Sequence, residues 1–196
     1  RFLLPESHVC AHPNGIDPAS YANIPPRSRA RKILGIPSRA KVVVYAGKAY
    51  RWKGLSILSR ASSLLPHVMV YFVGATSKEL EEVAGKILSP HMRCVGHKDV
   101  KEVPMWLSSA DACIVLGTSA NDYSYYHTSP MKFFEYMSAL RPVVAARTPA
   151  NCEIAEEAEA VFYEPDNEKD LAEKIHYALV EKKKMKKKVK DAHGKA

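Results

Sequence analysis

The chain has 196 residues and a mass of 21.8 kDa, close to one large domain at roughly 150 residues per domain. Apolar residues make up 46% and charged residues 26%, an ordinary globular composition that excludes collagen-like, mucin-like and wholly disordered chains. No apolar run approaches about 18 residues, so we expect neither a membrane-spanning segment nor a signal peptide.

The net charge of +8 is concentrated near the C-terminus. Residues 181–196 contain eight lysines against Glu181 and Asp191, a net charge of +6, whereas the other 180 residues carry 21 basic and 19 acidic groups. This balance does not favour nucleic acid as a partner, because nucleic-acid-binding domains spread positive charge over one face. Three hypotheses stay open for the lysines: a solvated helix end, attachment to an anionic membrane surface, or nucleic-acid binding, the last disfavoured because no aromatic residues are interleaved.

Cysteine and histidine spacing does not indicate a metal site. The eight histidines are scattered along the chain, and the four cysteines are too far apart for the C-x-x-C pattern. The cysteines are Cys10, Cys94, Cys113 and Cys152. Unpaired cysteines fit a reduced, cytoplasmic setting, and no G-x-S-x-G motif indicates a hydrolase.

Six short apolar runs predict strands that are covered on both faces, because they are continuous instead of alternating with polar residues. The runs are 41–47, 68–74, 91–96, 112–117, 142–146 and 160–163. Helical patterns are expected over 28–34, 53–65, 77–88, 103–109, 130–139 and 166–180. The helix over 130–139 is expected to start with Ser129 as N-cap and Pro130 in its first turn.

Alternating strands and helices predict an α/β domain with a doubly wound, mostly parallel, Rossmann-like sheet. We expect this domain to span residues 41–180. The proline-rich residues 1–40 read as a connector leading into it, and residues 181–196 as a lysine-rich C-terminal helix or tail.

Ligands of such a sheet bind at the carboxyl ends of its strands, so the loop after the first strand is the first candidate site. Gly47, Lys48, Arg51 and Lys53 lie there, just before a helix. Cations at a helix start suit a diphosphate, although a solvated basic loop explains them equally simply. The loop is neither a Walker A loop nor G-x-G-x-x-G, which disfavours mononucleotide hydrolysis and hydride transfer.

A second candidate loop spans residues 124–135. The free amides of Met131 and Lys132 are expected at the positive end of the next helix, where an anion binds well. Glu135, one turn on, could accept two hydrogen bonds from the vicinal hydroxyls of a ribose, or it is an ordinary surface glutamate. Nearby tyrosines either fill a cleft or cap the sheet edge.

A series of short motifs appears in a specific order and spacing. They are HPNGID (12–17), LGIP (34–37), YAG (45–47), KGL (53–55), FVG (72–74), AD (110–111), SPMKFFEYM (129–137), PVVA (142–145) and EPD (164–166). Each motif alone is weak, but together, over about residues 8–180, they resemble the glycosyltransferases of family 4 (group 1).

This resemblance implies one half of a GT-B enzyme, the C-terminal half that binds a nucleotide-diphosphate sugar. It implies that Lys48 and Lys53 neutralise the donor diphosphate without a metal, and that Glu135 binds the ribose. The implied catalytic residues are Lys53, Lys48 and Glu135. The implied donor-binding residues are Gly47, Lys48, Lys53, His127, Ser129, Pro130, Met131, Lys132 and Glu135.

The sequence departs from the family pattern at one position. The family motif E-x7-E has its first glutamate where this chain has His127. That glutamate helps to hold the donor sugar, so the identity of the sugar is open. His127 either hydrogen-bonds a hexose hydroxyl or is a surface histidine.

The function expected from the resemblance is therefore donor binding in a retaining, metal-independent glycosyltransferase. It would move a hexose from a UDP- or GDP-sugar to a glycan or lipid-linked acceptor, without a cofactor. The acceptor-binding N-terminal domain is not in these residues, so negligible transfer is expected from the chain alone. A non-catalytic nucleotide-sugar-binding or scaffold module is the alternative, and the SPMKFFEYM segment disfavours a sugar-nucleotide epimerase. The expected location is cytoplasmic, with peripheral membrane contact through the lysines as an open option.

Overall fold

The structure is a computed structural model that describes residues 15–17, 19–85 and 88–194. Its centre is a six-stranded sheet in which every pairing is parallel, in the order β3-β2-β1-β4-β5-β6. The strands are β1 (Lys41–Ala46), β2 (Val68–Val73), β3 (Met92–Cys94), β4 (Ala112–Val115), β5 (Val143–Ala146) and β6 (Val161–Tyr163). The predicted doubly wound α/β sheet is confirmed.

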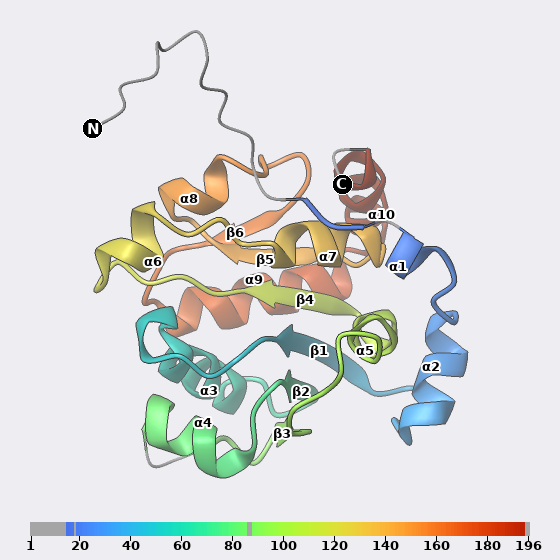
Figure 1. Ribbon diagram of the computed structural model, residues 1–196, viewed down its shortest axis with the longest axis horizontal. Coiled ribbons are helices and arrows are strands. Elements are labelled where there is room, and N and C mark those ends of the chain that lie inside the picture. The colour runs from blue at the N-terminus through green and yellow to red at the C-terminus, as the bar shows by residue number, and fades with distance from the viewer. Residues whose placement is uncertain (1–14, 18, 86–87, 195–196) are drawn as a thin grey trace, which may run out of the picture.

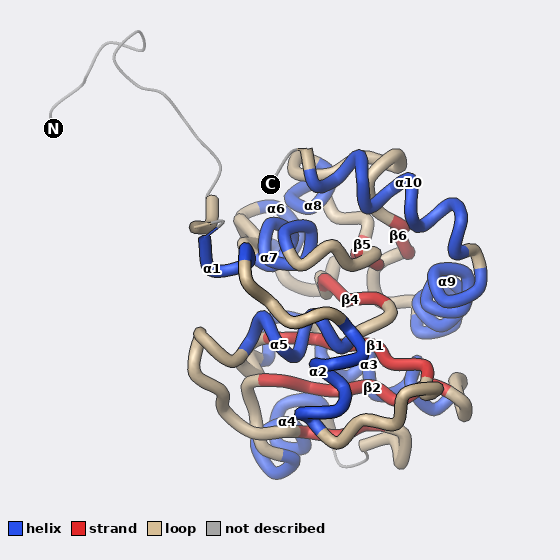
Figure 2. Tube along the Cα trace, turned by 90° about the vertical axis from the view of Figure 1, so that its right-hand side faces the viewer, coloured by secondary structure: helices blue, strands red, loops and turns tan. Residues whose placement is uncertain are grey.

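Helices lie on both sides of this sheet (Figure 1 and Figure 2). They are α1 (Ala19–Ala22), α2 (Arg27–Leu34), the 3₁₀ turn η2 (Arg51–Lys53), α3 (Leu55–Ser63), α4 (Ser77–Ala84), α5 (Val103–Ser109), α6 (Asp122–Tyr126), α7 (Lys132–Ser138), α8 (Pro149–Cys152), α9 (Glu168–Val180) and α10 (Lys182–His193). The helices α3 and α9 pack together over one face, and α5 and α7 contribute to the core on the other.

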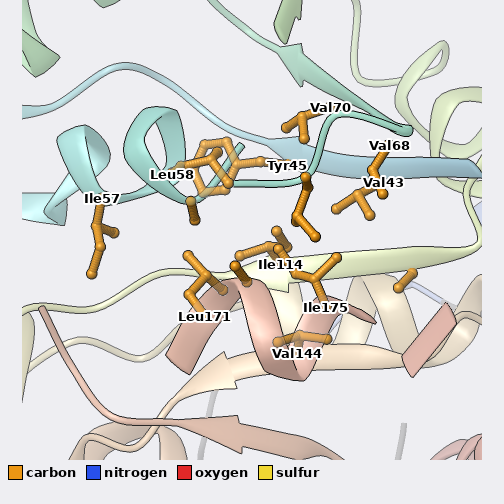
Figure 3. Close-up of a cluster of buried hydrophobic side chains, with 14 of the residues drawn as sticks. Val43, Tyr45, Ile57, Leu58, Val68, Val70, Ile114, Val144, Leu171 and Ile175 are labelled. Carbon is orange, nitrogen blue, oxygen red and sulfur yellow. The ribbon is translucent and has the colours of Figure 1, made fainter. Parts of the chain in front are cut away.

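The core of the first face is a continuous apolar cluster, shown in Figure 3. Val43 of β1, Ile57 of α3, and Leu171 and Ile175 of α9 all belong to this cluster, and all are buried. Removing an aliphatic side chain of this size from water contributes roughly 1.5–3 kcal/mol. The apolar runs become strands because both of their faces are covered in this way.

The order in which strands are added to the sheet reverses between the neighbouring strands β1 and β4. The chain first runs outward from β1 through β2 to β3, then returns to β4 beside β1 and continues outward to β6. In a parallel sheet this switch point leaves a crevice at the carboxyl ends of the two central strands. The crevice is thus expected outside Ala46 and Val115.

Two of the expected helices begin differently in the structure. The expected helix over 53–65 is divided by Gly54, whose left-handed conformation (φ 66°) separates η2 from α3. A side chain there would also approach Cβ of Thr118 to 3.0 Å, so glycine fits both the turn and the contact. The helix predicted over 130–139 begins only at Lys132, with Met131 as its N-cap. Because Ser129 accepts the Met131 N–H through its carbonyl (2.9 Å), the chain turns once more before the helix, and Ser129 is not the predicted cap.

The residues before β1 are attached to the sheet by a buried arginine of α2. The Arg31 guanidinium donates hydrogen bonds to the carbonyl oxygens of Ser109, Ser38 and Ala40, and it pairs with Asp111 at 2.9 Å. Each of these partners accepts a charge-assisted bond, which compensates the burial of the charge. Residues 1–14 of the expected connector lie outside the described residues.

Most of the lysine-rich segment forms α10. Its Met185 and Ala192 are buried, and the helix packs against α7 and α9. Lys188 donates a hydrogen bond to the carbonyl of Ala160 (3.0 Å). The segment is therefore a docked helix as far as His193. Within the described part of the chain, no helix is long and apolar enough to cross a bilayer.

Candidate functional site

A cavity of about 240 Å³ lies at the switch point of the sheet. Its walls come from the ends of β1 and β4, from η2, from α6, and from the segment that leads into α7. The lining residues are Tyr45, Trp52, Lys53, Val115, Leu116, Tyr123, Ser124, Thr128, Ser129, Pro130, Met131 and Lys132. The two loops chosen from the sequence thus meet around one space.

Lys132 crosses the end of β1 directly above Gly47. A Cβ atom built on Gly47 would lie 2.5 Å from Cε and 2.8 Å from Nζ of Lys132, so only glycine leaves room for this side chain. Gly47 is in turn fixed by its N–H, which donates to the carbonyl of Val73 (2.7 Å). The start of α7 is held to the same strand, because the Tyr136 hydroxyl accepts the Ala46 N–H at 3.0 Å.

Two lysine side chains, Lys53 and Lys132, reach this cavity. Burial lowers the pKa of Lys53 to about 8, and the nearby charge of Lys132 adds to this shift. Burial also lowers the pKa of Lys132, although the charge of Glu135 opposes it. Among the described residues, neither ammonium group forms an ion pair. An anion entering here would replace lost hydration and relieve the repulsion of the two cations.

A buried hydroxyl group faces the same cavity. Tyr45 is 1% exposed, and its hydroxyl has no hydrogen-bond partner among the described residues. The oxygen lies 3.2 Å from the Cβ position of Gly47, beside the ammonium group of Lys132. A buried hydroxyl normally has a partner, so the Tyr45 hydroxyl retains unused hydrogen-bonding capacity next to the cavity.

Aromatic rings line the mouth of the cavity. Trp52 stacks on Tyr50, with ring centroids 5.8 Å apart and planes at 12°, and it meets the ring of Tyr123 edge-on at 5.0 Å. The ammonium group of Lys53 lies 4.9 Å from the centroid of Trp52 and 5.0 Å from that of Tyr50. These cation–π contacts orient Lys53 and favour its charged form.

The site therefore combines paired cations, a free hydroxyl and an aromatic rim at the switch point of a doubly wound sheet. A profile of the family described as Glycosyl transferases group 1 matches residues 40–181. The chain belongs to the group 1 glycosyl transferases. No curated protein matches this sequence closely enough to be called a relative.

Solved structures of low sequence identity share the fold. Sucrose-phosphate synthase from Thermosynechococcus elongatus is 22% identical, with a TM-score of 0.76 over 92% of this chain and 46% of its own. HepE from Anabaena, solved in complex with UDP and glucose, is 24% identical, with a TM-score of 0.74 over 92% of this chain and 50% of its own. The chain thus spans about half the length of these GT-B glycosyltransferases.

A third structure corresponds to nearly the same unit. It is the C-terminal domain of the group 1 glycosyl transferase LpcC from Francisella tularensis, 18% identical, with a TM-score of 0.70 over 92% of this chain and 95% of its own. The fold of this group 1 chain is therefore that of one Rossmann-like half of a GT-B protein.

The structure brings together most of the residues expected to bind the donor. Lys53 and Lys132 both line the cavity, Ser129, Pro130 and Met131 form part of its wall, and Gly47 lies beneath Lys132.

Glu135 lies one turn beyond Lys132 on α7, but it is not part of the cavity lining. It is half-buried, and burial raises the pKa of its carboxyl group while the charge of Lys132 opposes the shift. Burial raises the pKa of Tyr21, and the negative charge of Glu135 adds to this shift. Glu135 is thus a desolvated carboxylate at the edge of the site.

Lys48 faces a neighbouring cavity of about 280 Å³ instead, together with Tyr50, Glu79 and His97. There Glu79 and His97 form a pair at 2.9 Å, and the pKa of Glu79 falls to about 2, mainly because its carboxylate accepts the Thr76 N–H. Tyr50 lines this neighbouring cavity, and its ring stacks on that of Trp52, which lines the main cavity. The structure thus separates the two lysines that the sequence grouped together.

His127 ends α6 and is exposed, with its ring 6.1 Å from that of Tyr126. It does not line the cavity. Tyr45 and Trp52 do, although sequence reasoning did not select them. The available signal was aromatic residues in a loop at the carboxyl edge of the sheet, a pattern that also describes an ordinary packed edge.

The described residues contain no group of three or more histidine, cysteine, aspartate or glutamate side chains able to hold a metal ion. Chemically, the arrangement suits an anion with several oxygen atoms, bound by two ammonium groups and a hydroxyl, next to an apolar or planar group.

Proposed function

We propose that this chain is the donor-binding half of a retaining, metal-independent glycosyltransferase that moves a hexose from a UDP- or GDP-sugar to a glycan or lipid-linked acceptor. The observation that carries the proposal is a pair of partly buried ammonium groups, Lys53 and Lys132, that form no ion pair among the described residues, in a cavity also lined by Tyr45, whose hydroxyl has no hydrogen-bond partner there. Support comes from family membership and from HepE, which was solved in complexes with UDP and with UDP-glucose.

In this function the lysines act on the leaving group. Breaking the glycosidic bond leaves a nucleoside diphosphate with an added negative charge. Fixed cations in a partly dehydrated site stabilise that charge without reorganising at the moment of reaction. Lys53 is the better placed of the two lysines expected from the sequence, and Lys48 reaches the diphosphate only if it leaves the neighbouring cavity. No cofactor is required.

Glu135 has the proposed role of accepting hydrogen bonds from the ribose hydroxyls at the edge of the cavity. Its position one turn after Lys132 supports this, because the ribose adjoins the diphosphate in any nucleoside diphosphate. His127 has the proposed role of contacting the sugar, which its exposed position at the end of α6 allows.

We further propose that transfer requires an acceptor-binding N-terminal domain, since the chain spans about half of the GT-B proteins that it resembles. Transfer by the chain alone should then be negligible. A cytoplasmic location with peripheral membrane contact through the lysines belongs to the same proposal.

The first test is calorimetric titration of the chain with UDP, GDP and ADP in the absence of divalent metal. One nucleotide should bind, and Lys53→Ala and Lys132→Ala should each weaken it about tenfold or more, because a hydrogen bond to a charged group contributes roughly 1.5–3 kcal/mol. Lys169→Ala, which removes an exposed lysine of α9, is the matched control. Absence of binding to any of the three nucleotides by the folded chain would contradict the proposal.

Titration with inorganic pyrophosphate distinguishes the role of the two lysines from that of Glu135. Both lysine variants should bind it more weakly, whereas Glu135→Ala should weaken UDP or GDP binding and leave pyrophosphate binding unchanged. Equal effects of Glu135→Ala on both ligands would show that this carboxylate does not contact the ribose.

A scaffold that binds the nucleotide sugar without transferring it is the second candidate, favoured by His127 at the position of the family glutamate. The two functions differ once an acceptor-binding domain is supplied. A chain that binds the nucleotide but never consumes the sugar donor in that assembly would be a scaffold.

A further inference from the structure

A second cavity lies at the opposite edge of the sheet and plays no part in the proposed transfer. It measures about 330 Å³. Lys41 at the start of β1 and Asp111 just before β4 lie on one side, and Lys182 and Lys186 of α10 lie on the other. Because all strands are parallel, this is the edge of the amino ends, away from the proposed donor site.

The cavity is strongly cationic. Arg27, Lys41, Arg141, Lys182 and Lys186 contribute to its walls, against one carboxylate, Asp111. The Asp111 carboxylate already has ion-pair and hydrogen-bond partners within the protein.

Asp111 pairs with Arg27 at 2.6 Å and with the buried Arg31 at 2.9 Å, and it also accepts the Val42 N–H at 2.8 Å. Its single charge is thus shared by two guanidinium groups. Among the described residues, Lys41 forms no ion pair.

The positive charges act on one another within this space. Burial lowers the pKa of the Arg141 guanidinium, and the charges of Arg27 and Arg31 lower it further, whereas Asp111 and Cys113 oppose the shift. The Nε atom of Arg27 is buried and has no hydrogen-bond partner among the described residues. An anion with several acceptor oxygens in the cavity would relieve the repulsion among these cations.

The rest of the wall is apolar, which distinguishes this cavity from a site for a small soluble anion. Leu179 of α9 and Val189 of α10 contribute to it, and Leu140 lies at its edge with 47% of its side chain exposed. A phosphate group attached to a hydrocarbon chain would satisfy both parts of the lining.

The orientation of α10 continues the cationic surface outside the cavity. Burial of Met185 fixes the helix against the body, and Lys182 and Lys186, one turn apart, face the cavity. Lys183 and Lys187 lie on the same helix, exposed, and are not part of the lining.

We infer that this cavity binds the phosphate headgroup of an anionic membrane lipid, with α10 lying along the membrane surface. Basic pockets flanked by exposed lysines have this affinity because the surface potential attracts the helix while the pocket holds one headgroup. The inference does not depend on donor binding, since none of these residues lines the cavity at the carboxyl edge.

The test compares two double variants of equal charge on the same helix. Flotation with vesicles of phosphatidylcholine, with and without phosphatidylglycerol, measures binding of the full chain. Wild type should bind only the vesicles that contain phosphatidylglycerol. Lys183→Gln with Lys187→Gln should reduce this binding by roughly thirtyfold, the loss expected from two surface lysines, and Lys182→Gln with Lys186→Gln by about tenfold more, because the headgroup contacts in the cavity are lost as well.

Two outcomes of the vesicle experiment would by themselves overturn the inference. One is an equal loss in both double variants, which would mean general attraction of a charged helix, and the other is no preference for phosphatidylglycerol. Unchanged thermal midpoints and unchanged UDP or GDP binding in both variants show that neither the fold nor the donor site has been altered.

Titrations in solution distinguish a lipid headgroup from two other phosphate ligands, free phosphate and nucleic acid. Titration with inorganic phosphate and with a single-stranded oligonucleotide should show weak binding that is the same in both double variants. A larger loss of either ligand in Lys182→Gln with Lys186→Gln would assign the cavity to free phosphate or to nucleic acid and overturn the lipid assignment. Leu140→Ser should weaken vesicle binding but not these soluble ligands, because it changes only the apolar edge.

Discussion

The side chain of Lys132 occupies the space that a side chain at Gly47 would need, with its Cε atom 2.5 Å from the position of the missing Cβ. The contact joins the end of β1 to the first residue of α7, which are 85 positions apart. It places an ammonium group at the centre of the switch point, where a ligand of a doubly wound sheet is bound. The absence of a side chain at Gly47 is therefore as much a part of the site as the lysine itself.

Gly47→Ala should lower nucleotide affinity more than it lowers stability. The new methyl group meets the far end of a flexible lysine, which can move aside, and lies 3.2 Å from the Tyr45 hydroxyl. The displaced ammonium group then leaves its place in the cavity. We expect a loss of about tenfold in affinity and of roughly 1 kcal/mol in the free energy of unfolding, the usual cost of alanine in place of a conformationally special glycine. Calorimetry and urea denaturation measure the two quantities.

Gly74→Ala is the contrasting substitution. A Cβ atom there would lie 2.7 Å from the carbonyl oxygen of Gly47, which is backbone and cannot move independently of β1. This variant should lose clearly more stability than Gly47→Ala. If the order of the two stabilities were reversed, the end of β1 would be more adaptable than the structure indicates.

Nucleotide binding should weaken as the pH rises through about 8. In the free chain the pKa of Lys53 is lowered to about 8, so its ammonium group is charged below that pH and increasingly neutral above it. A diphosphate binds the charged form and raises the pKa again, so binding near pH 8 takes up a proton. Titrations in buffers of different ionisation enthalpy detect this uptake.

The same residue has the opposite effect on the stability of the free chain. The unfolded chain holds the Lys53 proton up to its ordinary pKa of 10.5, whereas the folded chain releases it from about pH 8. Between these values the unfolded state binds more protons, so the contribution of Lys53 to the free energy of unfolding rises with pH. Lys53→Arg stays charged throughout and should abolish both pH dependences, and their persistence in this variant would assign them to another group.

Tyr45→Phe should leave the free chain as stable as before or slightly more stable, and bind the nucleotide several-fold more weakly. The variant removes a buried hydroxyl that has no partner in the described structure, and a buried unsatisfied group costs roughly 1–3 kcal/mol. Tyr136→Phe is the matched control, because its hydroxyl accepts the Ala46 N–H and its removal should lower stability by about 1 kcal/mol. A clear loss of stability in Tyr45→Phe would show that its hydroxyl already has a partner.

The sheet could be predicted from the sequence because its strands are buried on both faces. A run such as Val42, Val43 and Val44 is apolar whichever neighbours it has, so the pattern is readable without the fold. The predicted starts of the helices were less accurate, since the position at which a helix begins also depends on contacts with the sheet. The hydrogen bond from Ala46 to Tyr136 and the turn at Ser129 decide where α7 begins, and neither is visible in local sequence.

Side chains whose partners are distant in sequence could not be placed in advance. Arg31 lies in a short, highly charged segment that reads as exposed, yet it is buried because Asp111, 80 residues later, accepts its charge. In the candidate site the family motif correctly grouped Lys53 with Lys132. It could not show that Lys48 lines a different cavity from Lys53.

Trp52 should report ligand binding through its fluorescence. Its ring lines the donor cavity, stacks on Tyr50 and lies under the ammonium group of Lys53, so a bound nucleotide changes its surroundings directly. The other tryptophan, Trp106, is buried against Tyr71 and does not line that cavity. Titration with the nucleotide found by calorimetry should change the emission of wild type and of Trp106→Phe, but not of Trp52→Phe. The Trp52 ring also orients Lys53 through a cation–π contact of roughly 0.5–1 kcal/mol. Trp52→Ala should therefore weaken nucleotide binding by about three- to fivefold. A signal that disappears only in Trp106→Phe would place the nucleotide on the other face of the sheet and contradict the site described.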